Sequence, residues 1–319
     1  MTLTICTLGE VLVEFLSQKP KQKFTQPGEF TGPYPSGAPA IFAAQVAKLG
    51  HRAILFGCVG NDDFGRLSIE RLRHEGVITD GIRVMDNAVT GTAFVSYHTP
   101  LQRDFVFNIP NSACGLLTAE HIDKDLLRQS RHLHIMGSSL FSFRMIDTMR
   151  KAIAEVKAAG GTVSFDPNLR KEMLSIPEMA QALDYLIEYT DIFIPSEHEL
   201  SFFARHKNQA EAQIVEDLLK RGVKHIAIKR AQRGASYYRF EDQALYALHT
   251  AGHQVDIVDP TGAGDCFGAT FVTLFLAGFS AQQALQYACA SGAMAVTRKG
   301  PMEGISSQSE IEAFLHDGT

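Results

Sequence analysis

Short runs of strand-forming residues alternate with amphipathic helical segments along most of this chain. Strands are predicted at Leu3–Leu8 and Ala53–Val59, and a helix between them at Pro39–Leu49 that ends at Gly50. Further strands are predicted at His132–Met136, Thr162–Phe165, Ile192–Pro195, His225–Lys229 and Ser236–Phe240, with a helix at Met145–Ala158. This order predicts an α/β fold in which a mostly parallel sheet carries helices on both faces.

Two segments interrupt the alternation. Residues 82–112 are strand-like without intervening helices, and Phe24–Pro35, within residues 12–36, is rich in aromatic residues, Gly and Pro. We expect these two insertions to pair into a small extra sheet that forms a lid on the main body. The chain shows no internal repeat, low-complexity tract or interdomain linker, so residues 1–319 are predicted to form a single domain with this lid.

The composition argues against several classes of protein. With 30 Lys and Arg against 35 Asp and Glu, the net charge is −5, which offers no basic surface for nucleic acid. The longest apolar stretch, Cys266–Phe279, is too short to span a bilayer and is predicted to be a buried helix. The five cysteines are never in C-x-x-C spacing, and the N-terminus predicts a strand rather than a signal peptide. We therefore expect a cytoplasmic protein with neither nucleic acid nor a membrane as partner.

A glycine-rich turn follows a predicted strand at Val255–Val258. Residues Thr261–Asp265, which read T-G-A-G-D, lead into the apolar helix. At such a junction backbone N–H groups converge on an anion, and the helix N-terminus adds about half a positive charge. The turn therefore suits a phosphate, although it matches neither G-x-x-x-x-G-K-[ST] nor G-x-G-x-x-G.

Asp265 is the unusual residue of this turn, because a carboxylate beside a bound phosphate is repulsive. As a general base it has a role there: it accepts the proton of a hydroxyl that attacks a γ-phosphoryl group held by the same turn. The alternative is an ordinary turn between strand and helix, in which Asp265 favours the first helical turn through the helix dipole. The turn by itself leaves both interpretations open.

Taken together, the motifs resemble the ribokinase-like (PfkB) family of carbohydrate kinases. The family signature D-x-x-G-A-G-D reads here as Asp259–Asp265, and the resemblance extends along nearly the whole chain through Gly9-Glu10, Ser36–Pro39 and Val59–Gly65. It implies a ribokinase-like, doubly wound sheet with a small β-sheet lid. It also implies an enzyme that transfers a phosphoryl group from ATP to a primary hydroxyl of a small sugar.

The same resemblance assigns the catalytic groups. The last carboxylate of the signature is the general base, and the backbone N–H groups of its glycine-rich part bind the charge of the transferring phosphoryl group. The family's D-x-N-x-R element, residues 166–170, adds a planar arginine donor for substrate or phosphate; the alternative is a strand-terminal turn with a solvated arginine. The catalytic residues implied are Asp265, Gly262, Ala263, Gly264 and Arg170.

The nucleotide side of the resemblance rests on weaker motifs, which plain turn and helix packing would also explain. Ser196 replaces the Asn of the family's N-x-x-E, and Glu199 is its acid, implied to position Mg²⁺ indirectly. Asp259 and Thr261 are candidates for binding a monovalent cation, K⁺. The ATP-binding residues implied are Ser196, Glu199, Lys229, Arg230, Gly234, Cys289 and Gly292.

The sugar side departs from the family pattern. Ile41 stands where a sugar-binding Asn is usual, and Ile109 where relatives acting on 2-keto-3-deoxygluconate carry an Arg for the carboxylate. An unpaired buried carboxylate is costly, so we expect a neutral ketohexose, fructose- or tagatose-like, unless Arg103 or Arg170 takes over. The substrate-binding residues implied are Glu14, Gly37, Ala38, Ile41, Phe94, Phe107, Asp166 and Asn168. Alternating aromatic residues are also what any half-buried strand shows.

Other functions stay open. A 2-keto-3-deoxygluconate kinase is the first alternative, and a nucleoside kinase is a second, which would need stacking aromatic residues in its acceptor site. A non-catalytic sugar or nucleotide sensor could keep the fold, but it would lose the base, and Asp265 is present. We also expect a homodimer through the lid, because an aromatic lid face would leave an apolar patch on a monomer.

Overall fold

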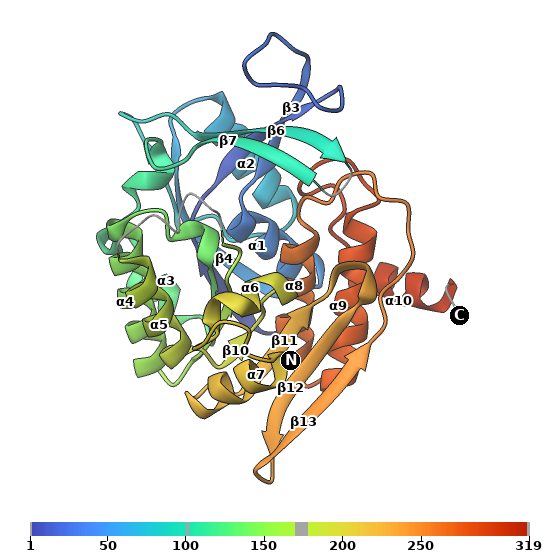
Figure 1. Ribbon diagram of the computed structural model, residues 1–319. Helices are drawn as coiled ribbons and strands as arrows, with labels where there is room; N and C mark the ends of the chain where they lie inside the picture. The colour runs from blue at the N-terminus through green and yellow to red at the C-terminus, as the bar shows by residue number, and fades with distance from the viewer. Residues whose placement is uncertain (1, 100–101, 170–177, 318–319) are drawn as a thin grey trace.

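The computed structural model describes residues 2–99, 102–169 and 178–317. Within them, the core is a nine-stranded sheet in the order β13-β12-β11-β10-β9-β8-β1-β4-β5 (Figure 1). Its strands are β1 (Thr4–Leu8), β4 (Arg52–Gly60), β5 (Ile82–Met85), β8 (His132–Met136), β9 (Thr162–Asp166), β10 (Ile192–Phe193), β11 (His225–Lys229), β12 (Ala235–Glu241) and β13 (Ala244–Thr250). Together with the helices on both of its faces, this sheet confirms the α/β prediction.

The strand order contains one switch point. The strands from β11 to β5 run parallel, and only the β12–β13 hairpin at one edge is antiparallel. From β1 the chain continues outward to β4 and β5 on one side, and from β8 outward to β11 on the other. Ligand sites of such sheets lie beyond the carboxyl ends of the strands at the switch point. The loops after β1 and β8 therefore mark where a site is expected.

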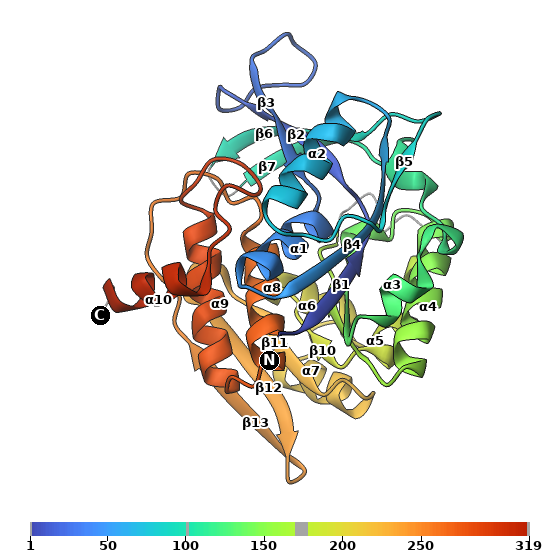
Figure 2. The ribbon, with the colours of Figure 1, turned by 180° about the vertical axis from the view of Figure 1, so that it is seen from behind.

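Helices cover both faces of the main sheet (Figures 1 and 2). One apolar core joins α3, α4, α5 and α7 to the sheet, and a second joins α1, α8 and α9 to its other face. The helices are α1 (Ala38–Lys48), α2 (Asp63–His74), α3 (Lys124–Arg128), α4 (Phe143–Ala158), α5 (Met179–Tyr189), α6 (Glu197–Leu200), α7 (Glu211–Lys220), α8 (Ala263–Leu276), α9 (Ala281–Ala295) and α10 (Gln308–Asp317). The apolar helix predicted from Cys266 is the buried α8, and none of the helices described is long and apolar enough to cross a membrane.

A second sheet of four described strands, in the order β3-β2-β6-β7, lies at one end of the molecule (Figure 2). It contains β2 (Leu12–Ser17), β3 (Phe30–Ser36), β6 (Gly91–Thr99) and β7 (Gln102–Asn108), all from the two insertions. The predicted start of the second insertion at 82 is wrong, because β5 pairs in parallel with β4 in the main sheet. The helix α2 between β4 and β5 supplies the crossover that a parallel pair requires.

The predicted strand at Val255–Val258 is also wrong, since residues 251–260 contain no strand. The Val258 side chain is 54% exposed, and the N–H groups of Val258 and Asp259 donate to the Val296 carbonyl at the end of α9. The alternating Val and Ile residues satisfy the strand pattern, but β12 and β13 already complete that edge of the sheet. The segment that precedes the glycine-rich turn is therefore a loop.

Candidate active site

The glycine-rich turn forms the N-terminus of α8. Gly262, the N-cap residue, has a φ of 80°, and a Cβ at this position would lie 2.4 Å from the Pro301 carbonyl oxygen. Both the conformation and the space therefore require glycine. Ala263 and Gly264 open the helix, so the N–H groups of the first turn and the helix dipole are directed at the same place. This is the geometry of an anion-binding site.

Asp259 fixes the turn from the loop before it. Its Oδ1 accepts hydrogen bonds from the Thr261 N–H at 3.0 Å and the Thr261 hydroxyl at 2.7 Å, and its Oδ2 accepts from the Gly300 N–H at 3.0 Å. The carboxylate is 1% exposed, and within the described residues it forms no ion pair. Asp259 and Thr261 thus have a structural role, because their hydrogen bonds fix the turn.

Asp265 lies in the first turn of α8 and is 8% exposed. The side-chain amide of Asn168, in the loop after β9, lies 3.5 Å from its Oδ1. The structure therefore brings the predicted base together with one residue of the D-x-N-x-R element. Arg170, the arginine of this element, lies outside the described residues.

The ends of β9 and β11 meet beside this turn. Lys229 Nζ donates to Asp166 Oδ2 at 2.5 Å, and a Cβ added to Gly264 would lie 3.6 Å from the same nitrogen. Burial raises the pKa of Asp166 to about 6, although Lys229 acts in the opposite direction. The sequence placed Asp166 with the sugar and Lys229 with the nucleotide, whereas in the structure they form one pair.

Ser196 and Glu199 form a capping box at the start of α6. The Ser196 N–H donates to Glu199 Oε2 at 2.8 Å, and the Ser196 hydroxyl accepts from the Glu199 N–H at 3.3 Å. The other carboxylate oxygen accepts from the Leu169 N–H at 3.0 Å. Burial favours the neutral acid, but Lys229 and these donors together lower the pKa of Glu199. Glu199 is therefore ionised and fixed by backbone groups, so it would act on a metal through water.

Arg230 has protein partners for its guanidinium. The group forms ion pairs with Glu197 and Glu211, and its Nε donates to the Ser236 hydroxyl at 2.8 Å. Because the side chain is only 10% exposed, these contacts hold it in the protein. The geometry gives Arg230 the role of joining α6 and α7 to the edge of the sheet, and does not support a contact with the nucleotide.

The other predicted nucleotide residues shape the backbone around the turn. Gly234 has a φ of 92°, and a Cβ there would meet the Thr250 carbonyl oxygen at 1.9 Å, so the turn before β12 requires glycine. In α9, Gly292 lets that helix approach the Ala263 carbonyl oxygen, which a Cβ would meet at 3.3 Å. Cys289, on the same helix, is 8% exposed in the apolar core.

On the sugar side, Glu14 of β2 is 7% exposed and accepts a hydrogen bond from the Ser36 hydroxyl at 2.7 Å. Gly37 is the N-cap of α1 with a φ of 117°, and Ala38 begins the helix as a buried residue. Ile41 is 2% exposed and would lie 3.4 Å from a Cβ on Gly262. The position where the family has a sugar-binding Asn is thus filled by an apolar contact with the anion-binding turn.

Phe94 and Phe107 lie on opposite faces of the small sheet. Residues paired across strands share a face, and Phe107 pairs with Ala93 whereas Phe94 pairs with Val106. Glu14 also pairs with Ala93, so it shares the face of Phe107. The prediction that both aromatic residues line the sugar site is therefore wrong, because strand alternation allows only one of them to do so.

The face that carries Phe107 is directed at the glycine-rich turn. Arg103, on this face of β7, donates from Nη1 to the Thr261 hydroxyl at 2.6 Å, and its guanidinium carbon lies 5.2 Å from the centre of the Phe105 ring. Beside it, burial and the Asp259 carboxylate raise the pKa of Tyr97. Phe94 belongs to the outer face, where its ring stacks on Phe15 at 5.1 Å.

Glu10 is a buried acid at the switch point for which the sequence predicted no role. It follows β1, is 3% exposed, and accepts hydrogen bonds from the hydroxyls of Ser138, at 2.9 Å, and Ser139, which follow β8. These bonds tie together the two loops where the strand order reverses. The signal in the sequence was that Glu10 and Ser138 each stand two residues after the end of a predicted strand.

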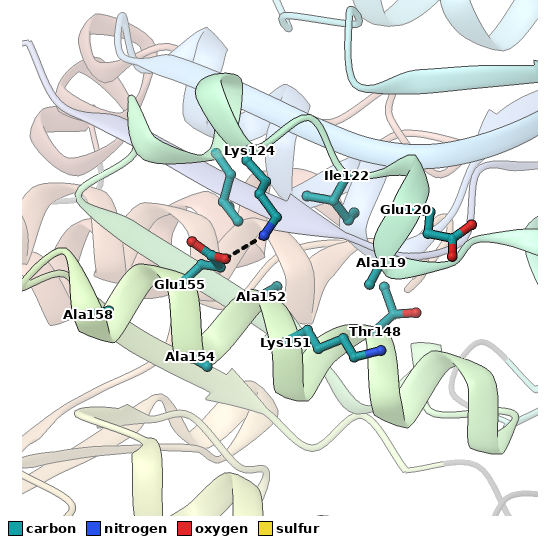
Figure 3. A pocket seen from close by; sticks show the side chains of 11 residues that line it. Ala119, Glu120, Ile122, Lys124, Thr148, Lys151, Ala152, Ala154, Glu155 and Ala158 are labelled. Carbon is teal, nitrogen blue, oxygen red and sulfur yellow. Dashed lines mark hydrogen bonds and ion pairs between the residues drawn. The ribbon is translucent and has the colours of Figure 1, made fainter.

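A surface hollow of about 520 Å³ lies elsewhere, between α4 and the chain around α3 (Figure 3). Its rim carries the Lys124–Glu155 ion pair, and Ile122, Leu127 and Ala152 line its interior. These residues belong to the face of the sheet opposite α8. The hollow is therefore separate from the glycine-rich turn.

Residues 3–308 match the pfkB family of carbohydrate kinases over nearly the whole chain. This chain belongs to that family. It is therefore a carbohydrate kinase. Individual relatives also resemble this chain over nearly its whole length. The chain is 30% identical to "Probable fructokinase-3" of Arabidopsis thaliana, over 98% of this chain and 91% of that protein.

Two solved pfkB-type structures share the fold. A putative Ribokinase II from E. coli, in complex with ATP and Mg²⁺, superposes with a TM-score of 0.93 at 50% identity, covering 99% of each chain. A fructokinase from Vibrio cholerae O395 in its fructose, ADP and calcium ion bound form gives a TM-score of 0.82 at 27% identity, covering 98% of this chain and 99% of that one. The ribokinase-like fold predicted from the motifs is thus confirmed.

Proposed function

We propose that this pfkB kinase transfers the γ-phosphoryl group of ATP to a primary hydroxyl of a neutral ketohexose, fructose- or tagatose-like. The observation that carries the proposal is the anion-binding turn Gly262–Gly264 with the buried carboxylate of Asp265 next to it. Likeness to fructokinases supports the substrate class. Ile41 and Ile109, which add no polar group, agree with a substrate without a charge.

The chemistry follows from this geometry. Asp265 accepts the proton as the sugar oxygen forms its bond to the γ-phosphorus, and the bond from that phosphorus to the bridging oxygen of ADP breaks. The N–H groups of Gly262, Ala263 and Gly264 stabilise the charge on the transferring group. In this proposal the sugar hydroxyls are oriented by Glu14, which accepts a hydrogen bond from Ser36, and by Asn168, which lies beside Asp265.

The proposed cofactors are ATP, Mg²⁺ and K⁺. Mg²⁺ keeps most of its waters in kinase sites, and the ionised Glu199 and the carboxylate of Asp166 suit such indirect binding. A monovalent cation beside Asp259 and Thr261 would offset a buried carboxylate that has no ion-pair partner within the described residues. When bound, the Mg²⁺ ion supplies positive charge to the phosphates.

We also propose that the protein is cytoplasmic and a homodimer. All five cysteines are free and buried, which suits a reducing compartment. On the outer face of the small sheet, Phe15 and Phe94 stack at 5.1 Å, Phe30 meets Phe94 edge to face at 5.5 Å, and Val106 is 48% exposed. Pairing two copies of this face would cover its apolar groups.

A second candidate, a 2-keto-3-deoxygluconate kinase, is favoured by one observation: Arg103 reaches Thr261 of the catalytic turn, where it could bind a carboxylate. An ATP-consumption screen over ketohexoses, aldohexoses, pentoses, 2-keto-3-deoxy acids and nucleosides decides between them. We expect turnover with a ketohexose. Turnover only with a sugar acid would refute the neutral substrate, and turnover only with nucleosides would favour a nucleoside kinase.

The role of Asp265 is tested by Asp265→Asn, for which we expect turnover to fall about 10²-fold or more while folding and ATP binding persist. Asp256→Asn, in the exposed part of the preceding loop, is the matched control and should leave turnover unchanged. Near-normal phosphoryl transfer by Asp265→Asn would contradict the mechanism. Wild-type protein that binds ATP but phosphorylates no acceptor would point to the sensor instead.

A further inference from the structure

The loop after β9, residues 167–169, holds Asn168 in an unusual backbone conformation. Its φ is 36°, in the left-handed region that residues with a side chain seldom adopt. The Asn168 side-chain amide lies 3.5 Å from Oδ1 of Asp265, the proposed base. A disfavoured conformation persists only where the surrounding contacts determine it. The contacts that hold this loop therefore also set where the amide stands relative to the base.

Two contacts fix the residues on either side of Asn168. The Leu169 N–H donates to Glu199 Oε1 at 3.0 Å. The Pro167 carbonyl oxygen lies so close to Gly137 that a Cβ at residue 137 would meet it at 1.7 Å. The strands β8 and β9 are paired in parallel up to their last residues, so Gly137 and Pro167 are the first residues beyond the pair. The loop after β9 thus rests on the backbone of the turn after β8.

Glu10 holds the turn after β8, which is the 3₁₀ turn Gly137–Ser139. Two hydroxyls of this turn converge on one carboxylate: Ser138 donates to Glu10 Oε1 at 2.9 Å, and Ser139 donates to Oε2. All three side chains are buried, so water does not replace a bond that is lost. The turn therefore cannot move away from Glu10 without leaving buried hydroxyls unpaired.

Close packing fixes the position of Glu10 itself. A Cβ on Gly9 would meet Ser139 Oγ at 2.1 Å, and a Cβ on Gly37 would meet the Glu10 carbonyl oxygen at 2.3 Å. Glycine at both positions lets the segment after β1, the turn after β8 and the N-terminus of α1 come together around Glu10. Because Glu10 follows β1, which lies between β8 and β4, the turn after β8 is held to the centre of the main sheet.

We propose that Glu10 is a positioning residue for phosphoryl transfer. It holds the turn after β8 against Pro167, and this contact keeps the Asn168 amide beside Asp265. The role rests on the proposed function, in which Asp265 accepts the proton of the sugar hydroxyl. Glu10 needs no contact with the substrate, because a displacement of about 1 Å in the groups that align the reactants can lower the rate about 100-fold.

The first test is Glu10→Met, which removes both hydrogen bonds and fills a similar volume. We expect it to lower kcat about 10- to 100-fold and to leave the KM for ATP unchanged, because the anion-binding turn is untouched. Glu10→Gln can accept from one serine and donate to the other, so it should restore kcat to within about 3-fold of the wild type. Normal kcat in Glu10→Met, or no recovery in Glu10→Gln, would overturn the proposal.

Asp191→Asn is the matched control for a loss of stability. Asp191 is a buried acid that accepts from the Val163 N–H at 2.8 Å, at the amino ends of β9 and β10 and so at the opposite edge of the sheet. We expect Asp191→Asn to lower the free energy of unfolding and to keep the kcat of the wild type. A fall in kcat as large as that of Glu10→Met would overturn the proposal, because lower stability alone would then explain both.

Asn168→Gly tests whether Glu10 acts through Asn168, because glycine tolerates the left-handed backbone and lacks the amide. In the Asn168→Gly background we expect Glu10→Met to lower kcat by less than about 2-fold, since the group that it positions is already gone. An equal loss of kcat in both backgrounds would overturn the proposal, because Glu10 would then act by another route.

Hydrogen exchange of the full chain separates this proposal from the proposed function, because it needs no substrate. The Leu169 N–H is bonded to Glu199 in the wild type, and we expect it to exchange faster in Glu10→Met but not in Glu10→Gln. This result would support the role of Glu10 even if the screen found no sugar acceptor. Unchanged exchange in Glu10→Met would overturn the role of Glu10 and leave the kinase function standing.

Discussion

The two glycines at the ends of the anion-binding turn have different reasons to be glycine. Gly262 has a left-handed backbone, and a Cβ there would clash with the Pro301 carbonyl oxygen at 2.4 Å. Gly264 has no positive φ, and its Cβ would make an ordinary contact with Lys229 Nζ at 3.6 Å. Folding therefore requires glycine at the first position, whereas at the second position the fold has space for a side chain.

We expect Gly262→Ala to lower the free energy of unfolding by about 2 kcal/mol or more, because it adds strain and a clash. Gly264→Ala should leave the free energy of unfolding unchanged or raise it by up to about 1 kcal/mol, because alanine favours the helix. Urea unfolding of both variants measures the difference. Equal free energies of unfolding for Gly262→Ala and Gly264→Ala would contradict this prediction, because the turn would then accommodate a side chain at residue 262.

At this scale the sequence was informative where the candidate residues lie in a contiguous motif. Asp265 and its turn could be predicted because seven consecutive residues carry the pattern. The Asp166–Lys229 pair could not, because it depends on β9 and β11 lying two places apart in the sheet with their carboxyl ends at one edge. The sequence motif around Arg230 also could not show that its guanidinium forms ion pairs with Glu197 and Glu211.

Among the elements, β8 and β9 carry a buried polar chain. Both ring nitrogens of His132 are hydrogen-bonded, to the Thr162 and Ser164 hydroxyls at 2.7 Å, and Ser164 also meets His134 Nδ1 at 2.6 Å. The strands themselves were predicted from their apolar residues. Their contacts were not, since alternation indicates a strand but not its neighbour, and the same limit explains the error at Val255–Val258.

The buried His132 makes stability depend on pH. Burial lowers its pKa to about 3, below the ordinary 6.5 of the unfolded chain, so its contribution is complete above about pH 6.5 and is lost as the pH falls. Between pH 7 and pH 5 the loss is about 2 kcal/mol. We expect His132→Gln to reduce the pH dependence of the free energy of unfolding by this amount, measured by denaturation at both pH values. His74→Gln, at an exposed helix end, is the control and should behave as the wild type.

At the scale of the whole molecule, the small sheet contacts the glycine-rich turn of the main body. Its inner face holds Glu14 and reaches Thr261 through Arg103, while its outer face carries the stacked Phe15 and Phe94. The sequence indicated the sheet, through the break in alternation, but not which side chains share a face. That required the register, which places Phe94 opposite Val106.

The proposed dimer is tested on this outer face. Val106→Glu introduces a charge on this face, at the edge strand β7, and we expect light scattering to show a monomer where the wild type is a dimer, with turnover measured alongside. Val84→Glu is the matched control, because Val84 is 51% exposed on β5 of the main sheet. A monomeric wild type at micromolar concentration would contradict the dimer.

The position of β1 in the middle of the main sheet also sets the order in which its two neighbouring strands can pair with it during synthesis. This first strand pairs with β4 on one side and with β8 on the other, and β8 begins at His132. A growing chain that has left the ribosome only as far as residue 131 therefore has one edge of β1 open. Such an edge can pair with other chains, so we expect nascent chains of this length to aggregate more readily than chains from which β8 has emerged.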